Sequence, residues 1–435
     1  MGADDRGGTA AAAGSTRPGP GRRWRFWAAA CTYVVLLAGP NVPTPLYAGY
    51  EREFGFSPLT VTLVFAVYVA ALIPSLLAAG PLSDAVGRRR VLLPAVALAV
   101  AGSVVFALAA GTAWLFAARI IQGAALGTAS GAVTAALAEL EPDGNRRRAA
   151  MVAAVAAALG VGAGPLLGGL LAQYGPVPHV LPYLTEIALL VPAGIAVAVM
   201  PEPGTRSRWR PRRPQVPAAI RAPFLSSGAT SFLAWAVTAL FLTLIPSYVA
   251  SLTKSGNLAA GGGVVALMLG CSALTQRAAY GRRAAPLQTG GLGLLTISLV
   301  LLIAAGTVHS LGLLLGATVL AGAGQGLGFL GAMTQVSQAA PAGRHADVLS
   351  SFYVVTYLGT GLPVIGVGFL AVAVGLLPAV RIFAAITGAL CLAALAAAAR
   401  ARTPRVRPRP VPIETLPPGH PSRSRGSRES IRRGR

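Results

Sequence analysis

Twelve separate stretches of mostly apolar residues, each long enough to cross a lipid bilayer, dominate this 435-residue sequence. A helix needs about 20 apolar residues to span the hydrocarbon core. The predicted spans are 26–48, 59–80, 91–110, 113–138, 149–172, 181–200, 224–251, 259–278, 286–306, 310–336, 347–371 and 379–399. The sequence is 54% hydrophobic and 11% charged, whereas soluble domains carry about 25% charged residues. We therefore exclude a soluble enzyme and predict an all-α membrane protein with twelve transmembrane helices.

The charged residues predict how these helices are oriented. The chain has 36 basic and 13 acidic residues and a net charge of +23. The arginines gather in both terminal segments, the central loop and alternate short loops, which is the distribution expected of cytoplasmic segments. We predict a multi-pass protein of the cell membrane with both termini in the cytoplasm. The lipid bilayer, and not a nucleic acid, is the partner that explains the charge.

The spacing of the apolar stretches divides the chain into five parts. We predict a cytoplasmic N-terminal tail over 1–25, a six-helix bundle over 26–200, a cytoplasmic central loop over 201–223, a second six-helix bundle over 224–399, and an Arg/Pro-rich cytoplasmic tail over 400–435. The composition of the last part predicts disorder.

Short motifs of the first half recur in the second half in the same order. The offsets are about 200 residues, as expected for the internal repeats of secondary transporters. The pairs are Gly87-Arg88 with Gly281-Arg282, Gln122-Gly123 with Gln325-Gly326, and Gly164-Pro165 with Leu362-Pro363. This order predicts two pseudo-symmetric six-helix bundles.

The most specific motif lies between the second and third predicted helices and reads Gly80-Pro81-Leu82-Ser83-Asp84-Ala85-Val86-Gly87-Arg88-Arg89-Arg90. Gly80 permits close approach of a neighbouring helix, and Gly87 permits a tight turn. Arg88 follows Asp84 by four residues and can pair with it, or with Glu139 or Asp143. A polar turn with cytoplasmic arginines would explain the charges alone, but not the whole pattern.

This motif resembles the signature of the major facilitator superfamily of secondary transporters, which lies in the same loop. The resemblance covers about residues 26–400 and implies two six-helix bundles that work by alternating access. It also implies that Gly80, Asp84, Gly87 and Arg88 form a cytoplasmic latch between the halves that favours the outward-open state. A superfamily resemblance implies the fold more securely than the substrate.

Arg119-Ile120-Ile121-Gln122-Gly123 resembles a second motif of this superfamily, R-x-x-Q-G. An arginine inside a span costs at least about 2.5–3.5 kcal/mol, so it should face a polar cavity or a partner. The resemblance implies that Arg119 and Gln122 line the central cavity and that Arg119 takes part in proton coupling or senses substrate charge. The alternative is that Arg119 extends to the outer membrane interface.

Glu186 is an acid well inside the sixth predicted helix, at about the same depth as Arg119. Two interpretations stay open. Glu186 is a proton carrier that pairs with Arg119, or it complements the N-terminal dipole of a helix that Pro182 begins.

The fifth predicted helix carries Gly160, Gly164, Pro165, Gly168 and Gly169 in a pattern that resembles the G-x-x-x-G-P-x-x-G-G motif of antiporters in the superfamily. Glycines four residues apart form a flat ridge for close helix packing, and the proline adds a kink. General packing in a Gly-rich chain is the alternative. The resemblance favours an exporter over an importer.

Residues that face a substrate are harder to identify. Three prolines between residues 40 and 45 break the first helix near its outer end and expose backbone groups. Asn41 lies about where some drug-exporting relatives carry an aspartate, which puts a proton site at that position in doubt. The weak cavity candidates are Asn41, Tyr68, Gln325 and Tyr357. A cavity so poor in charge suits an apolar solute.

We therefore predict a secondary active transporter that exports a small lipophilic or drug-like molecule in exchange for protons. It would act as a monomer, without cofactor or metal. An importer or uniporter of a sugar or another small metabolite is the alternative on the same fold. A polytopic membrane transferase is more distant, because its expected cluster of carboxylates or histidines at one interface is missing from the sequence.

Overall fold

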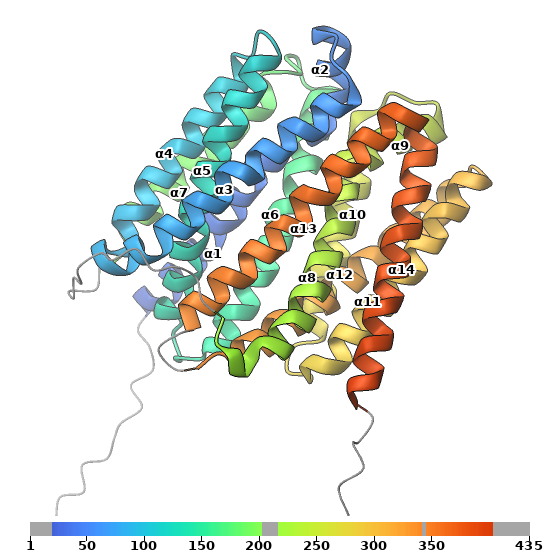
Figure 1. Ribbon diagram of the computed structural model, residues 1–435. Coiled ribbons are helices and arrows are strands. Elements are labelled where there is room, and N and C mark those ends of the chain that lie inside the picture. The colour runs from blue at the N-terminus through green and yellow to red at the C-terminus, as the bar shows by residue number, and fades with distance from the viewer. Residues whose placement is uncertain (1–19, 202–215, 342–344, 403–435) are drawn as a thin grey trace, which may run out of the picture.

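The computed structural model describes residues 20–201, 216–341 and 345–402, and within these ranges every regular element is a helix (Figure 1). Most of the two predicted tails and of the central loop lies outside the described residues. The described chain begins at Pro20 and ends at Arg402 at the same end of the molecule, the lower end in Figure 1. We call this the arginine-rich end. The opposite end, where α2 and α9 lie, is the arginine-poor end.

The elements of the first half are α1 (Pro20–Ala38), η1 (Gly39–Asn41), η2 (Thr44–Leu46), α2 (Tyr47–Phe54), α3 (Pro58–Val86), α4 (Arg88–Ala107), α5 (Thr112–Leu140), α6 (Arg146–Tyr174) and α7 (Leu181–Ala198). Those of the second half are η3 (Ala218–Ile220), α8 (Arg221–Thr243), α9 (Ile245–Thr253), α10 (Leu258–Ala278), α11 (Ala284–Thr307), α12 (Leu311–Ala339), α13 (His345–Val374) and α14 (Leu376–Arg402). Helices therefore extend into segments predicted as the N-terminal tail, the central loop and the C-terminal tail.

Twelve helices of the described chain are long and apolar enough to cross a membrane, which confirms the predicted fold class. Their most apolar windows have mean hydropathies between 1.3 and 2.3. The structure lengthens several of the predicted spans. For example, α3 continues beyond residue 80 to Val86, and only Gly87 separates it from α4. Gly87 makes this turn with φ of 105°, a backbone conformation that glycine adopts without strain.

Two of the membrane-spanning helices are broken near the arginine-poor end. The first gives way after Ala38 to two 3₁₀ turns, η1 and η2, where the closely spaced prolines lack the N–H groups that a continuous helix needs. The seventh span was predicted as continuous over 224–251, but it breaks at Leu244. Pro246 follows this break at once and cannot donate to the carbonyl four residues earlier.

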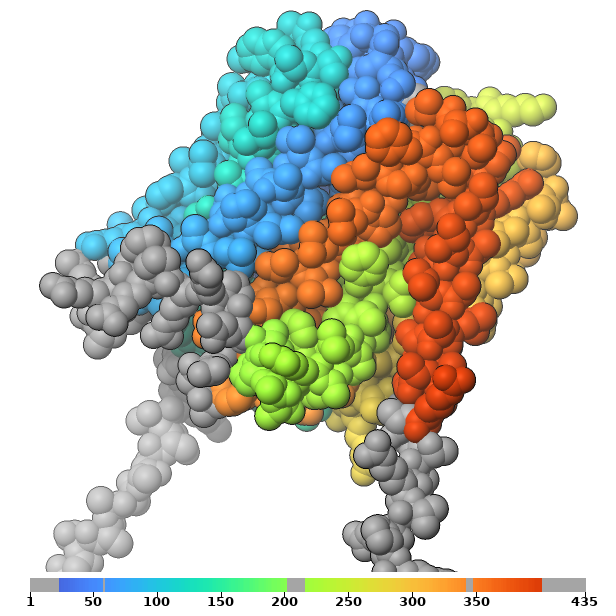
Figure 2. All heavy atoms as spheres, in the orientation of Figure 1, coloured from blue at the N-terminus to red at the C-terminus, as the bar shows by residue number. Residues whose placement is uncertain are grey.

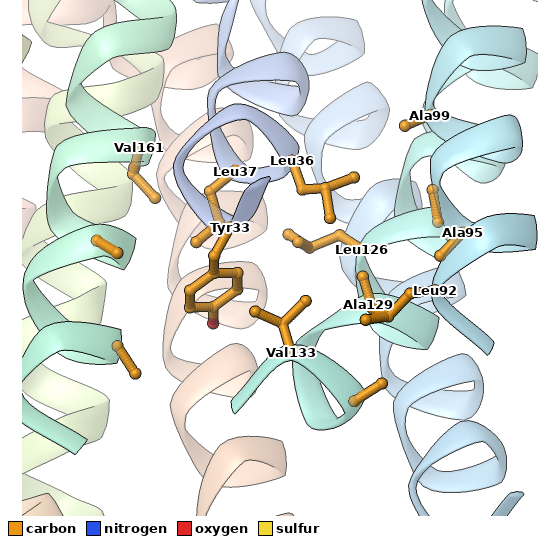
Figure 3. Packing of buried hydrophobic residues seen from close by; sticks show 14 of the residues in the cluster. Tyr33, Leu36, Leu37, Leu92, Ala95, Ala99, Leu126, Ala129, Val133 and Val161 are labelled. Atoms are coloured by element: carbon orange, nitrogen blue, oxygen red, sulfur yellow. The ribbon is translucent and has the colours of Figure 1, made fainter. Parts of the chain in front are cut away.

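Small residues allow the helices of each half to pack closely. In the first half, Tyr33 and Leu36 of α1 lie over Leu126 and Ala129 of α5 in one buried apolar cluster (Figure 3). A second cluster joins α8 to α11, α12 and α14. The first cluster also includes Leu242 of α8 and Leu269 of α10, so apolar packing continues from the first half into the second.

The two halves meet along two helix pairs, α3 with α13 and α6 with α10. Figure 2 shows α3 and α13 side by side across the surface. Gly361 and Gly368 of α13 pack against Val69 and Thr62 of α3. Because Thr62 lies near the start of α3, these contacts bring the halves together towards the arginine-poor end.

Gly322 offers a test of this close packing. A Cβ at this position of α12 would overlap the carbonyl of Met268 on α10. We expect Gly322→Val to lower stability by about 1–3 kcal/mol, since overpacking forces backbone shifts. Gly316→Val on the same helix is the matched control, because no atom lies within 4 Å of a Cβ there. Thermal unfolding of the two purified variants in detergent measures the difference, and equal stability would contradict the packing.

Candidate functional site

A buried arginine holds the break in the first helix. The side chain of Arg119 on α5 is fully buried. Its Nε donates to the Tyr47 hydroxyl at 2.7 Å, and its Nη1 donates to the carbonyl of Pro40. That carbonyl is available because Pro43, three residues later, has no N–H to donate. Gln122 lies one turn further along α5, with its Oε1 3.4 Å from Nη1.

Four aromatic rings surround the same guanidinium group. Its central carbon lies 5.5 Å from the ring centroids of Tyr47 and Tyr68, 5.8 Å from Phe65 and 5.7 Å from Phe106. Cation–π contacts of a desolvated charge contribute about 2 kcal/mol. Arg119 thus lies inside the first half and does not extend to the outer interface.

Glu186 lies on the other side of the same break. Its carboxylate packs directly against Gly39, where a Cβ would overlap it. Ser103 of α4 is its polar neighbour, and Arg119 interacts with it electrostatically. Oε2 of Glu186 has no hydrogen-bond partner, and no ion pair to Glu186 is present among the described residues. Glu186 stands in the second turn of α7, beyond the first turn where the helix dipole acts most strongly.

The predicted latch residues form an ion-pair cluster within the first half. Arg88 contacts Asp84 at 2.5 Å and Glu139 at 2.8 Å, and it donates to the Ser83 hydroxyl. Asp143 instead contacts Arg148 on α6. The cluster joins α3, α4 and α5, with Gly87 in the turn and Gly80 seven residues before it. A role as a latch between the halves stays a prediction.

One contact between the halves at the arginine-rich end had no clear signal in the sequence. The guanidinium group of Arg147, at the start of α6, lies 5.3 Å from the ring centroid of Tyr280, at the end of α10. The repeated motif Gly281-Arg282 follows Tyr280 directly. It indicates that this loop corresponds to the one with Gly87-Arg88, but it does not predict the contact with Arg147. The two halves therefore touch at the arginine-rich end through a cation and an aromatic ring.

The glycine motif of α6 faces two neighbours at once. A Cβ on Gly160, Gly164 or Gly168 would meet backbone of α1 or of the residues that follow it, up to Val42. Gly169 faces the backbone of Leu258 at the start of α10. The carbonyl of Pro165 lies against Gly262 of α10. The same helix thus contacts the broken first span and the second half.

The four weak cavity candidates separate into two kinds. Asn41 donates to the carbonyl of Leu37, and Gln325 accepts from Ser272 on α10, so both are bonded within their own half. Tyr68 and Tyr357 come from opposite halves and interact with each other and with Tyr33 of α1. The sequence analysis missed Tyr33, because a single tyrosine in an apolar helix resembles a core residue.

A cavity of about 460 Å³ lies between the halves at the arginine-poor end. Its lining includes Tyr47, Glu51, Arg52 and Lys254 together with apolar residues of α3, α10 and α13. Tyr47 therefore connects this cavity to Arg119. The cavity was not predicted, because it depends on how the two broken helices face each other.

Comparisons with known proteins agree with this architecture. Residues 29–363 match the sequence profile of the Major Facilitator Superfamily. The cephamycin export protein of Amycolatopsis lactamdurans is 31% identical over 199 residues, which cover 44% of this chain and 40% of that protein. The chain thus spans less than half the length of this curated relative.

Two solved structures share the fold. One is a bacterial homologue of the human lysosomal transporter Spinster, with a TM-score of 0.64, 17% identity, and coverage of 88% of this chain and 96% of the other. The other is the human organic anion transporter MFSD10, with a TM-score of 0.62, 18% identity, and coverage of 87% and 100%.

A double-mutant cycle tests the contact between Arg119 and Tyr47. A hydrogen bond to a charged group contributes about 1.5–3 kcal/mol, so Tyr47→Phe should destabilise the protein by about that amount. In an Arg119→Leu background the same substitution should have almost no effect, because the bond is already absent. Thermal unfolding of the four proteins gives the coupling energy. An additive result would show that the contact contributes nothing to stability.

Proposed function

The chain belongs to the Major Facilitator Superfamily of membrane transporters, and from this premise we propose that it exports a small lipophilic or drug-like molecule in exchange for protons. The protein would lie in the cell membrane with both termini in the cytoplasm, as the arginine distribution favours. The arginine-rich end is then the inner end, and the arginine-poor end is the outer end.

The observation that carries the proposal is the placement of Arg119 and Glu186 on either side of the break in the first helix. A buried carboxylate without an ion-pair partner is costly in its charged form, whereas arginine keeps its charge throughout. Proton binding at Glu186 would therefore abolish its attraction to Arg119. Since Glu186 contacts Gly39 and Arg119 contacts Pro40, the charge state of Glu186 acts directly on the broken segment.

The helix contacts support a route from this segment to the rest of the protein. The glycine ridge of α6 packs against α1 on one side, and Gly169 and Pro165 face α10 on the other. A shift of the broken segment would thus displace α6 and change its contact with α10 of the other half. The Arg88 cluster and the contact of Arg147 with Tyr280 lie at the inner end, where the halves must part to admit a solute from the cytoplasm.

The residues between the halves support a lipophilic solute. Tyr33, Tyr68, Tyr353 and Tyr357 gather there, and Trp235 lies nearby on α8. Aromatic rings with hydroxyl groups bind apolar surfaces and donate single hydrogen bonds. The similarity to a protein named for cephamycin export, together with the α6 motif, supports export over import.

Proton release in everted membrane vesicles tests the proposal. We would impose an inside-acid gradient, follow it with a pH-sensitive dye, and add ethidium, tetraphenylphosphonium or cefoxitin. We expect at least one compound to release protons through the wild type. Glu186→Gln should abolish this response, because an amide cannot carry a proton. Asp347→Asn on α13 is the matched control and should respond like the wild type.

Two outcomes would contradict the proposal. One is an unchanged response in Glu186→Gln, which would exclude this carboxylate as the proton carrier. The other is a folded, inserted wild-type protein that responds to no compound. Accumulation of a solute that follows its own gradient without moving protons would favour the uniporter.

A further inference from the structure

Beyond the buried pair, the outer end of the first half carries two titratable residues that no predicted role includes. Nε2 of His179, in the loop before α7, lies 3.8 Å from a carboxylate oxygen of Glu53 on α2. Both side chains are about half exposed, at 43% and 56%. They therefore form a polar contact that is open to water at the outer end.

Two tyrosines lead inward from this contact. The ring of Tyr50 on α2 lies 4.9 Å from the ring of His179. The hydroxyl of Tyr50 is hydrogen-bonded at 3.1 Å to that of Tyr183 on α7, and both residues are almost completely buried. Stacking on Phe54 and Phe106 fixes the two rings. This rigid pair places hydroxyl groups where an apolar core would otherwise be continuous.

The buried acid Glu186 follows Tyr183 by one turn on the same buried face of α7, and a turn rises about 5 Å. Arg119 and Tyr47 interact electrostatically with Tyr183. A tyrosine hydroxyl both donates and accepts a hydrogen bond, whereas arginine only donates and does not lose its proton. The tyrosines are thus suited to pass a proton, and Arg119 is not.

The other helices around Glu186 offer few ionisable alternatives. Between Arg148 and Tyr174, α6 has no ionisable side chain, and α4 has none beyond its arginines at the cytoplasmic end. In α1, the titratable residues inside the span are Cys31, which is exposed, and Tyr33, which lies with the tyrosines between the halves. Arg119 of α5 remains the charged neighbour of Glu186.

From these contacts we infer that protons reach Glu186 from the outer side through Tyr50 and Tyr183, inside the first half and apart from the solute path. A proton from outside water binds at the Glu53 and His179 contact. Tyr50 and Tyr183 each accept one proton and release another, and the carboxylate of Glu186 receives the last. Glu186 then releases its proton to the cytoplasm, so that one proton leaves for each proton that enters. The route rests on the proposed function, because it assumes that Glu186 binds the coupling proton.

Infrared spectroscopy of the full-length protein in liposomes tests the route without a solute. The probe is the proton itself, added as a rapid drop of the external pH. A protonated carboxyl group gives a C=O band, and the part of this band that Glu186→Gln removes belongs to Glu186. We expect Tyr50→Phe and Tyr183→Phe to slow its appearance by at least about tenfold, with the same final amplitude. Both substitutions keep the stacked rings, so the fold should persist.

Tyr248→Phe is the matched control, a buried tyrosine of the second half whose hydroxyl donates to the Leu302 carbonyl, and should respond at the wild-type rate. Wild-type rates in both Tyr50→Phe and Tyr183→Phe would overturn the route. So would slowing in Tyr47→Phe alone, which would place proton entry at the outer cavity. A wild type without any Glu186 band would also overturn it. The infrared and vesicle experiments can fail separately. A normal Glu186 band combined with no proton release by any compound would contradict the proposed exchange of solute for protons, but not the route.

Discussion

The arrangement of the first half depends on one buried charge, the guanidinium group of Arg119. Three closely spaced prolines prevent the first helix from continuing, and a free carbonyl at Pro40 is the consequence. Arg119 donates to that carbonyl and to Tyr47, and four rings surround its remaining surface. The charge is thereby accommodated inside the protein, and the break is held in one position. Every other element of the candidate site, from Glu186 to the glycine ridge of α6, is placed relative to this fixed break.

Glycine positions explain how the helices of this bundle can pack so closely. The ridge on α6 lets α1 approach until backbone meets backbone, and Gly262 does the same for α10 against Pro165. Contacts made by backbone and small side chains have few interlocking side chains to separate. Large apolar residues fill the remaining space, and Tyr33, Leu36 and Leu126 of the first half share one cluster with Leu242 and Leu269 of the second. Glycines therefore set how closely the helices approach, and large apolar residues fill the interior between them.

The sequence predicts the fold well because a membrane allows few structures. Apolar stretches of the right length must be helical, since every backbone polar group needs an internal partner. It predicts helix ends less well, because α3 ends where Gly87 turns and not where hydropathy falls. A single proline at 246 gave too weak a signal for the break in the seventh span. Equal depth in the membrane suggested a pair of Arg119 and Glu186, whereas the described residues show an electrostatic interaction between them and no ion pair. The partner Tyr47 lies 72 residues from Arg119 in the chain, and only the folded break brings them together.

The two halves are alike in architecture but not in chemistry. Among the described residues, the fully buried charged side chains Arg119, Glu141 and Glu186 all belong to the first half. The buried polar groups of the second half are neutral, such as the amides of Gln288 and Gln325 with their serine partners. Neutral hydrogen bonds do not change when a proton binds elsewhere. Under the proposed exchange with protons, the change would begin in the first half and reach the second through the contacts of α6 with α10 and of α3 with α13.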